Sequence, residues 1–236
     1  MKFTKPLVAL TLLSATLLSA CSSLSPMVNT EPQAEDVAPE VLTPLQVKVK
    51  SLQGQPNLYQ DKKSQFSANN QTLSQFQKGL SLKQQGKFSE AKAVFSRLSE
   101  QHPELSGIWV QLALVNKQLS KKSTQQTLKD MARYLNNAVA ANPYNYVAHN
   151  ELGKVLRQQG QFQNALKHYD LALKSWPAFS QAYLNRGILY DLYLGEKSLA
   201  LNDYELYQAL SNDESRQLKG WIIDLQRQIK RAQAAS

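Results

Sequence analysis

Cysteine is almost absent from this chain of 236 residues, which contains only Cys21. A single cysteine cannot form a disulfide within the chain, so the fold must be stable without one. Histidine is also scarce, and the spacing of His102, His149 and His168 gives no reason for the three side chains to converge. The sequence shows no zinc-ligand spacing, phosphate-binding glycine loop or serine elbow. We therefore expect no catalytic residue, no metal site and no cofactor, and we expect that the protein is not an enzyme.

Long apolar runs are missing as well. The most apolar stretch, residues 7–18, has twelve residues, whereas a membrane-spanning helix needs about 20. It follows Lys2 and Lys5 and precedes two small residues, which is the pattern of a secretory signal peptide. We interpret residues 1–20 as such a peptide and expect no other segment to cross a bilayer.

The residues around the cysteine read Leu-Ser-Ala-Cys and resemble the lipobox of bacterial lipoproteins, in which the cysteine becomes the acylated N-terminus. The resemblance implies that Cys21 carries acyl chains, which contribute roughly 0.8 kcal/mol per buried CH₂ to membrane binding. Ser22 is not the aspartate associated with inner-membrane retention, so the resemblance implies an anchor in the bacterial outer membrane, facing the periplasm. The alternative is an ordinary secreted protein with a free thiol.

Charge is distributed unevenly along the chain, which carries a formal net charge of +9. Residues 22–47 contain four acidic residues and no lysine or arginine, so the remainder is strongly basic. Such a charge favours acidic partners or anionic surfaces. Nucleic acid is a poor candidate, because a lipid-anchored periplasmic protein does not meet it.

Large apolar residues are sparse between residues 22 and 70, and five of the nine prolines lie there. This composition cannot bury enough apolar surface to offset the entropy lost on ordering. We therefore predict that residues 21–70 are the lipidated cysteine and a flexible tether. Val47 and Val49 alternate with lysines, which leaves open a short strand or a docked segment at that point.

From residue 71 the apolar residues follow helical periodicity, and small residues and prolines recur 34 residues apart. The recurring pairs are Gly79 and Ala113, Gly153 and Gly187, and Pro143 and Pro177. In the unit from residue 146, Leu152 and Gly153 belong to a first helix, and Gly160 marks a turn. The second helix then places Phe162, Ala165, Tyr169 and Ala172 on one face.

This spacing and these residues resemble the tetratricopeptide repeat, a helix-turn-helix unit of about 34 residues. The resemblance implies an all-α fold, a right-handed superhelix of about four repeats over residues 71–213. The repeat ranges are 72–105, 106–145, 146–179 and 180–213. The second repeat carries about six extra residues and the fourth carries one near Gly195.

Residues 214–236 place Leu218, Trp221, Ile222, Leu225 and Ile229 at helical spacing, with lysines and arginines on the other face. An amphipathic helix in this place is expected to cap the open end of the stack. Two alternatives remain: a helix that binds a membrane surface, and a homodimer formed through this apolar stripe.

In the tetratricopeptide family the first helix of each repeat lines the concave surface, through which solenoids bind their partners. The positions implied, from the first unit to the fourth, are Phe76, Leu80, Val110, Leu114, Lys117, Asn150, Lys154, Arg157, Leu184 and Ile188. Apolar ends and a basic centre suit an extended or helical peptide with apolar anchors and an acidic group. Asn150, Lys154 and Arg157 resemble part of the carboxylate clamp of chaperone-binding members. Alternatively, some of these residues only pack on neighbouring helices or lie under the tether.

The resemblance also extends to lipid-anchored repeat proteins, namely type IV pilus pilotins, lipoproteins of tight-adherence pili and NlpI-like lipoproteins that dock peptidoglycan hydrolases. It implies an envelope scaffold that gathers protein partners for a pilus or secretion assembly or for peptidoglycan enzymes. One alternative is an accessory subunit of a Tol- or TonB-like energy-transducing complex. Another is an enzyme or small-ligand binder, which the missing site disfavours.

Overall fold

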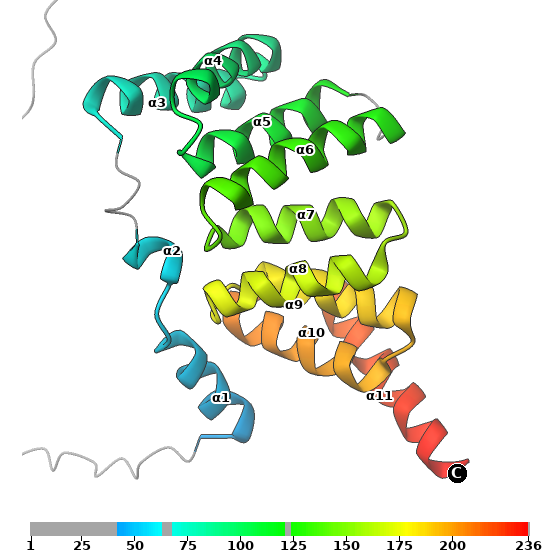
Figure 1. Ribbon diagram of the computed structural model, residues 1–236. Coiled ribbons are helices and arrows are strands. Elements are labelled where there is room, and N and C mark those ends of the chain that lie inside the picture. The colour runs from blue at the N-terminus through cyan, green and yellow to red at the C-terminus, as the bar shows by residue number, and fades with distance from the viewer. Residues whose placement is uncertain (1–41, 63–67, 121–123, 236) are drawn as a thin grey trace, which may run out of the picture. The chain divides into compact units, whose positions relative to one another are not determined.

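The computed structural model describes residues 42–62, 68–120 and 124–235, and within these ranges it contains helices and no strand. Eight α-helices form four consecutive pairs, one in each predicted repeat unit, and the pairs stack on one another (Figure 1). The pairs are α3 (Asn70–Gln84) with α4 (Phe88–Gln101), α5 (Ser106–Leu119) with α6 (Gln125–Ala141), α7 (Tyr146–Gln158) with α8 (Phe162–Ser175), and α9 (Ser180–Leu189) with α10 (Lys197–Ser211). A final helix, α11 (Arg216–Ala234), covers the end of the stack by packing on α10. The predicted all-α stack with a capping helix is confirmed.

The two helices of a pair approach closely because a glycine of the first helix faces an aromatic ring of the second. The contacts are Gly79 on Phe95, Gly153 on Tyr169 and Gly187 on Tyr204. A Cβ atom added to any of these glycines would lie within 2.8 Å of the ring, so the absence of a side chain sets the spacing of the helices. At the turn between α7 and α8, Gly160 adopts φ = 75°, a conformation that side chains disfavour.

Successive repeats are joined by a hydrogen bond that recurs with three different side chains. In each case the fourth residue of a first helix bonds the carbonyl of the proline six positions earlier. The bonds are Trp109 Nε1 to Pro103 O (2.8 Å), His149 Nε2 to Pro143 O (3.0 Å) and Tyr183 Oη to Pro177 O (3.1 Å). An indole, an imidazole and a phenol therefore fix the same turn.

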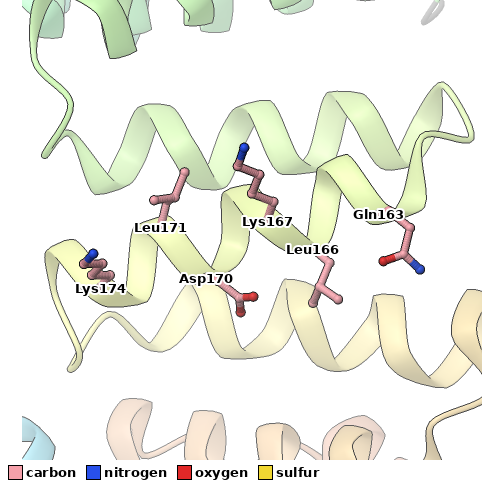
Figure 2. A pocket seen from close by; sticks show the side chains of 6 residues that line it. All are labelled: Gln163, Leu166, Lys167, Asp170, Leu171 and Lys174. Carbon is pink, nitrogen blue, oxygen red and sulfur yellow. The ribbon is translucent and has the colours of Figure 1, made fainter.

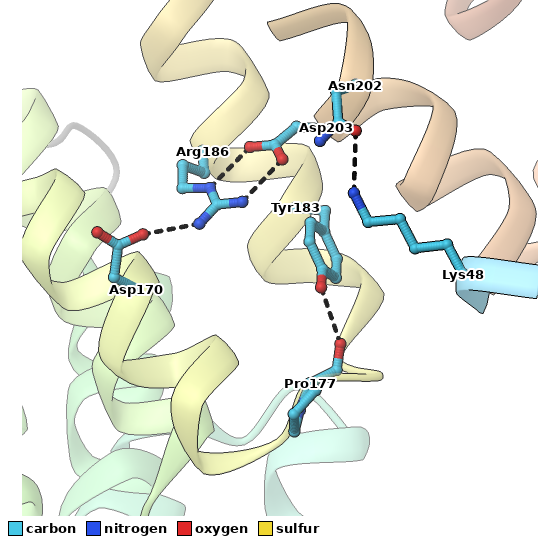
Figure 3. Close-up of polar contacts among 7 residues, drawn as sticks. All are labelled: Lys48, Asp170, Pro177, Tyr183, Arg186, Asn202 and Asp203. Carbon is cyan, nitrogen blue, oxygen red and sulfur yellow. Dashed lines mark hydrogen bonds and ion pairs between the residues drawn. The ribbon is translucent and has the colours of Figure 1, made fainter. Parts of the chain in front are cut away.

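The fourth repeat contains an ion pair between Arg186 and the buried Asp203. Arg186 occupies the position at which the third repeat has Leu152. Arg186 donates two hydrogen bonds to Asp203, at 2.7 and 2.8 Å, and one to Asp170 at 2.7 Å (Figure 3). Burial by itself would lower the pKa of Arg186, but the hydrogen bonds and charges of the two carboxylates outweigh it and raise that pKa. The cluster ties α8, α9 and α10 together.

Two further helices lie in the segment that the sequence predicts to be a flexible tether. They are α1 (Pro44–Gln53) and α2 (Leu58–Asp61), so the tether prediction is wrong for residues 42–62. Residues 21–41 and 63–67 lie outside the described residues. Thr43 and Gln46 form a reciprocal capping box, and Pro44 stands at the first turn, where a helix tolerates proline.

We call residues 42–62 the strap. Its residues Leu45, Val49 and Leu52 pack against the core cluster shared by α8, α9, α10 and α11. Lys48 Nζ donates to Asn202 Oδ1 on α10 at 3.1 Å (Figure 3). The docked segment that the sequence left open at residues 47–50 is therefore a helix, held at the fourth repeat.

From the fourth repeat the strap runs back along the turns that join the repeats. Tyr59 meets the ring of Tyr146 edge-on, with centroids 5.9 Å apart, and Tyr146 in turn contacts Trp176 and Phe179. The hydroxyl of Tyr59 shares a 3.4 Å hydrogen bond with Ser106 at the start of α5. The strap thus contacts the fourth, third and second repeats, in the direction opposite to the stack (Figure 1).

Two local irregularities match the extra residues in the sequence. A π-helical turn, η2 (Tyr190–Leu194), follows α9, and its wider turn accommodates the extra residue near Gly195. The longer connection of the second repeat includes residues 121–123, which lie outside the described residues. Among the described helices, none combines the length and the hydropathy that a membrane span requires.

Candidate functional site

The first helices of successive repeats contact one another directly and form one continuous surface. We call the surface of α3, α5, α7 and α9 the helix-A face. Helix α5 contacts α7, and α7 contacts α9. Between the last two, Asn185 Nδ2 donates to Asn150 Oδ1 at 2.9 Å.

The ten predicted groove residues divide by exposure. Eight are half-buried and keep surface on the helix-A face, namely Phe76, Leu80, Leu114, Lys117, Lys154, Arg157, Leu184 and Ile188. Val110 and Asn150 are each only 3% exposed. Val110 belongs to the core between the second and third repeats, and Asn150 is occupied by Asn185. These two residues therefore hold the helices together and offer a partner almost no surface.

Apolar surface lies at both ends of the helix-A face. At the first repeat Leu73 is 50% exposed, and Phe76 rests half-buried against Phe95 with ring centroids 5.6 Å apart. Beyond α9, Leu192 and Tyr193 are 67% and 45% exposed. Sequence reasoning missed these last two, which lie in the π-helical turn η2. The extra residue near Gly195 was the signal that could have located them.

The three cations among the predicted groove residues differ in their partners. Lys154 Nζ pairs with both carboxylate oxygens of Glu151, at 2.7 and 2.9 Å, so its charge is compensated within α7. The guanidinium of Arg157 lies over the ring of Tyr193, 5.7 Å from its centroid. Within the described ranges, neither Arg157 nor Lys117 forms an ion pair. Among the described side chains, these two cations therefore have no acidic counter-charge.

Tyr169 lies directly behind Arg157, fully buried between α7 and α8. Burial raises the pKa of Tyr169 to about 12, although the charge of Arg157 lowers it. The phenol of Tyr169 is therefore neutral under ordinary conditions and does not compensate the charge of Arg157. Its ring packs against Gly153.

Two of the three histidines converge, contrary to the sequence prediction. His149 Nδ1 and His168 Nδ1 are 3.0 Å apart, across α7 and α8. Because His149 Nε2 donates to the carbonyl of Pro143, its Nδ1 is the acceptor and His168 supplies the proton. Burial lowers the pKa of both, and the charges of His149 and Lys167 help to lower that of His168 to about 4.

The third histidine does not join this pair. His102 lies in a different turn, where its Nε2 bonds Thr72 Oγ1 at 2.9 Å. Over the described ranges, no group of three or more His, Cys, Asp or Glu side chains could hold a metal ion.

Two open hollows of the described surface are lined by none of the predicted groove residues. One, of about 350 Å³, lies along the outer side of α8 (Figure 2). Its lining residues are Gln163, Leu166, Lys167, Asp170, Leu171 and Lys174. The other, of about 360 Å³, lies at the turn between α7 and α8 and extends to Leu194. Neither is lined by a histidine, a cysteine or a serine.

Comparison with known proteins agrees with the paired helices. Family models described as tetratricopeptide repeat match residues 73–104, 132–178 and 150–215. Among solved structures, pilF from Pseudomonas aeruginosa is similar at 20% identity and a TM-score of 0.57, over 68% of this chain and 69% of that one. MamA (41-end) from Desulfovibrio magneticus RS-1 is similar at 14% identity and a TM-score of 0.56, over 72% and 91%.

A third similar structure is YrrB, described as a TPR protein with an unusual peptide-binding site, at 19% identity and a TM-score of 0.50 over 66% of this chain and 74% of that one. At these identities the likeness concerns the fold alone. Together with the family matches and the four glycine- or alanine-centred helix pairs, it shows that residues 70–211 fold as an all-α solenoid of the tetratricopeptide type.

Proposed function

We propose that this protein is a lipid-anchored adaptor of the bacterial envelope, facing the periplasm, whose helix-A face binds a protein partner. The partner belongs to a pilus or secretion assembly or is a peptidoglycan enzyme. The observation that carries the proposal is the composition of the helix-A face, with apolar surface at both ends and cations without an ion pair between them. The lipobox-like residues that end at Cys21 support the anchor.

The partner segment that fits this face is a helix or an extended peptide with apolar side chains and a carboxylate. Leu73 and Leu192 are the most exposed apolar residues at the two ends, and they suit apolar anchors. Lys117 and Arg157 suit the carboxylate, because a charge-assisted hydrogen bond is about twice as strong as a neutral one. A scaffold of this kind acts by raising the local concentration of its partner at the membrane.

The charge reversal Lys117→Glu tests the proposal. Lys117 is half-buried on α5, and reversing an interfacial charge is expected to cost about 2 kcal/mol, or roughly 30-fold in Kd. The partner is first captured by crosslinking in the native envelope and identified by mass spectrometry. Its affinity for the purified variant is then measured by calorimetry.

The matched control is Lys174→Glu, the same charge change at an exposed position on α8, outside the helix-A face. It is expected to leave the affinity unchanged, and neither variant should alter the melting temperature appreciably. Equal affinity of both variants for the captured partner would rule out the helix-A face as its binding site.

A further inference from the structure

Helix α11 carries a stripe of basic residues along its whole length. The stripe consists of Arg216, Lys219, Arg227, Lys230 and Arg231, against a single acidic residue, Asp224. At 3.6 residues per turn the five basic positions fall on one arc of about 120°. The residues that α11 buries, Leu218, Ile222 and Leu225, lie outside this arc and face the fourth repeat. The stripe therefore faces away from the core.

All five basic side chains belong to exposed residues, and Ile223, in the middle of the arc, is 46% exposed. Lys219 pairs with Glu214, an exposed residue just before the helix. For the other four basic residues of the stripe, no ion pair is found in the part of the chain that the structure describes. The stripe is a positive surface with a central apolar residue and few internal counter-charges.

The strap determines which end of the stack is connected to the N-terminal part of the chain. Helix α1 packs on α10 of the fourth repeat, and α11 packs on α10 as well. The apolar residues of α1 and α11 share one core cluster. The described chain therefore begins, at residue 42, beside the end of the stack that carries α11, and reaches the first repeat only after the strap (Figure 1).

We infer that the basic stripe of α11 lies against the anionic phospholipid surface to which the protein is anchored. The inference rests on the lipid anchor of the proposed function. Charges spread over a helix of about 28 Å, at 1.5 Å per residue, suit a diffuse negative surface. A single acidic partner would instead need carboxylates at five fixed positions. Because several acyl chains already give stable attachment, the stripe sets the orientation of the stack, with the first repeat pointing away from the membrane.

The test measures orientation on vesicles with the full acylated protein, purified from membranes. A nitroxide is attached through Gly220→Cys, which lies on the arc of the stripe and where an added Cβ has no heavy atom within 4 Å. A second protein carries the label at Ser89→Cys, an exposed position on α4 of the first repeat. Each is bound to vesicles of phosphatidylcholine alone or with phosphatidylglycerol, and accessibility to a water-soluble relaxation agent is measured after flotation.

With phosphatidylglycerol, accessibility at residue 220 is expected to fall at least threefold, while residue 89 stays accessible on both kinds of vesicle. The triple change Arg227→Gln, Lys230→Gln and Arg231→Gln should restore accessibility at residue 220 without reducing flotation. If the protein floats but residue 220 stays accessible, the orientation is refuted and the anchor stands. Failure to float overturns the anchor and the orientation with it. Protection that needs no phosphatidylglycerol would instead indicate a second copy of the chain and overturn the lipid assignment.

Discussion

Gly153 shows how one missing side chain positions two helices. The ring of Tyr169 lies so close that an added Cβ would be 2.5 Å from Cε1 and 2.8 Å from Cδ1. Tyr169 is fully buried and has no room to withdraw. In the second repeat the equivalent residue is Ala113, and Leu135, which occupies the position equivalent to Tyr169, is a buried member of the same core cluster as Ala113. Glycine is thus paired with tyrosine in the third repeat, and alanine with leucine in the second.

Gly153→Ala is therefore expected to destabilise the protein by about 1–3 kcal/mol, the usual cost of overpacking a core. The higher helix propensity of alanine, about 1 kcal/mol, offsets only part of this cost. The change in the free energy of unfolding is measured by urea denaturation.

Gly220→Ala is the matched control, because this glycine also lies inside a helix but an added Cβ meets nothing within 4 Å. It should stabilise the protein by roughly 0.5–1 kcal/mol. If both substitutions changed the free energy of unfolding in the same direction, helix propensity, and not the contact with Tyr169, would decide the outcome at Gly153.

The histidine pair predicts a pH dependence of stability. The pKa of His168 falls from its ordinary value of 6.5 to about 4 in the folded protein, mainly because of burial. Between these values the unfolded chain binds protons that the folded protein excludes, so stability is full above pH 6.5 and is lost as the pH falls towards 4. Because the His168 ring is partly exposed, the stability lost on acidification is smaller than the full pKa shift implies, on the order of 1 kcal/mol. This corresponds to roughly 2–4 °C in melting temperature.

His168→Gln should reduce this loss, because an amide can still donate to His149 Nδ1 but does not titrate. Melting temperatures are compared at pH 7.5 and pH 4.5 by circular dichroism. The control is His102→Gln, at the histidine outside the pair. If His168→Gln and the unmodified protein lose the same amount on acidification, the pair is not the source of the pH dependence.

At the scale of elements, regular periodicity is what the sequence predicts well. The recurrence of glycines and prolines 34 residues apart predicts the paired helices, and the spacing from Leu218 to Ile229 predicts the capping helix. Both are confirmed, because each depends on a pattern that is repeated within the chain.

The strap could not be predicted in the same way. Its prolines and sparse apolar residues are typical of disorder, and α1 has no buried residue of its own. Its helices depend on contacts with residues distant in sequence, such as Tyr59 with Tyr146 and Lys48 with Asn202. The capping box at Thr43 was the local signal that could have predicted the start of α1.

For the candidate site, the sequence predicts which residues lie on the helix-A face but not how deeply each is buried. Val110 and Asn150 are covered because the first helices of adjacent repeats touch, which is a property of tertiary packing. The contact between His149 and His168 also depends on how α7 and α8 pack against each other, and the linear spacing of the histidines does not reveal it.

At the scale of the whole molecule, the strap changes how the repeats depend on one another. In a solenoid each repeat contacts only its neighbours, so stability is a sum of local terms. Here the strap touches the second repeat at Ser106, the third at Tyr146 and the fourth at Asn202. Over the described ranges it forms no hydrogen bond or ring contact with α3 or α4. The last three repeats are therefore expected to unfold together, and the first more independently.

Releasing the strap with the double change Leu52→Ala and Tyr59→Ala tests this coupling. The two truncations remove the apolar contact with the fourth repeat and the ring contact with the third, at a combined cost of about 2–3 kcal/mol. Hydrogen exchange followed by mass spectrometry should then show lower protection in α5, α7, α9 and α10, with α3 and α4 unchanged as an internal reference. Gln60→Ala, at an exposed position of α2, is the control for substitution in the strap. A uniform loss of protection in all four repeats would contradict selective coupling by the strap, and unchanged protection throughout would show that the strap contributes nothing to the stability of the stack.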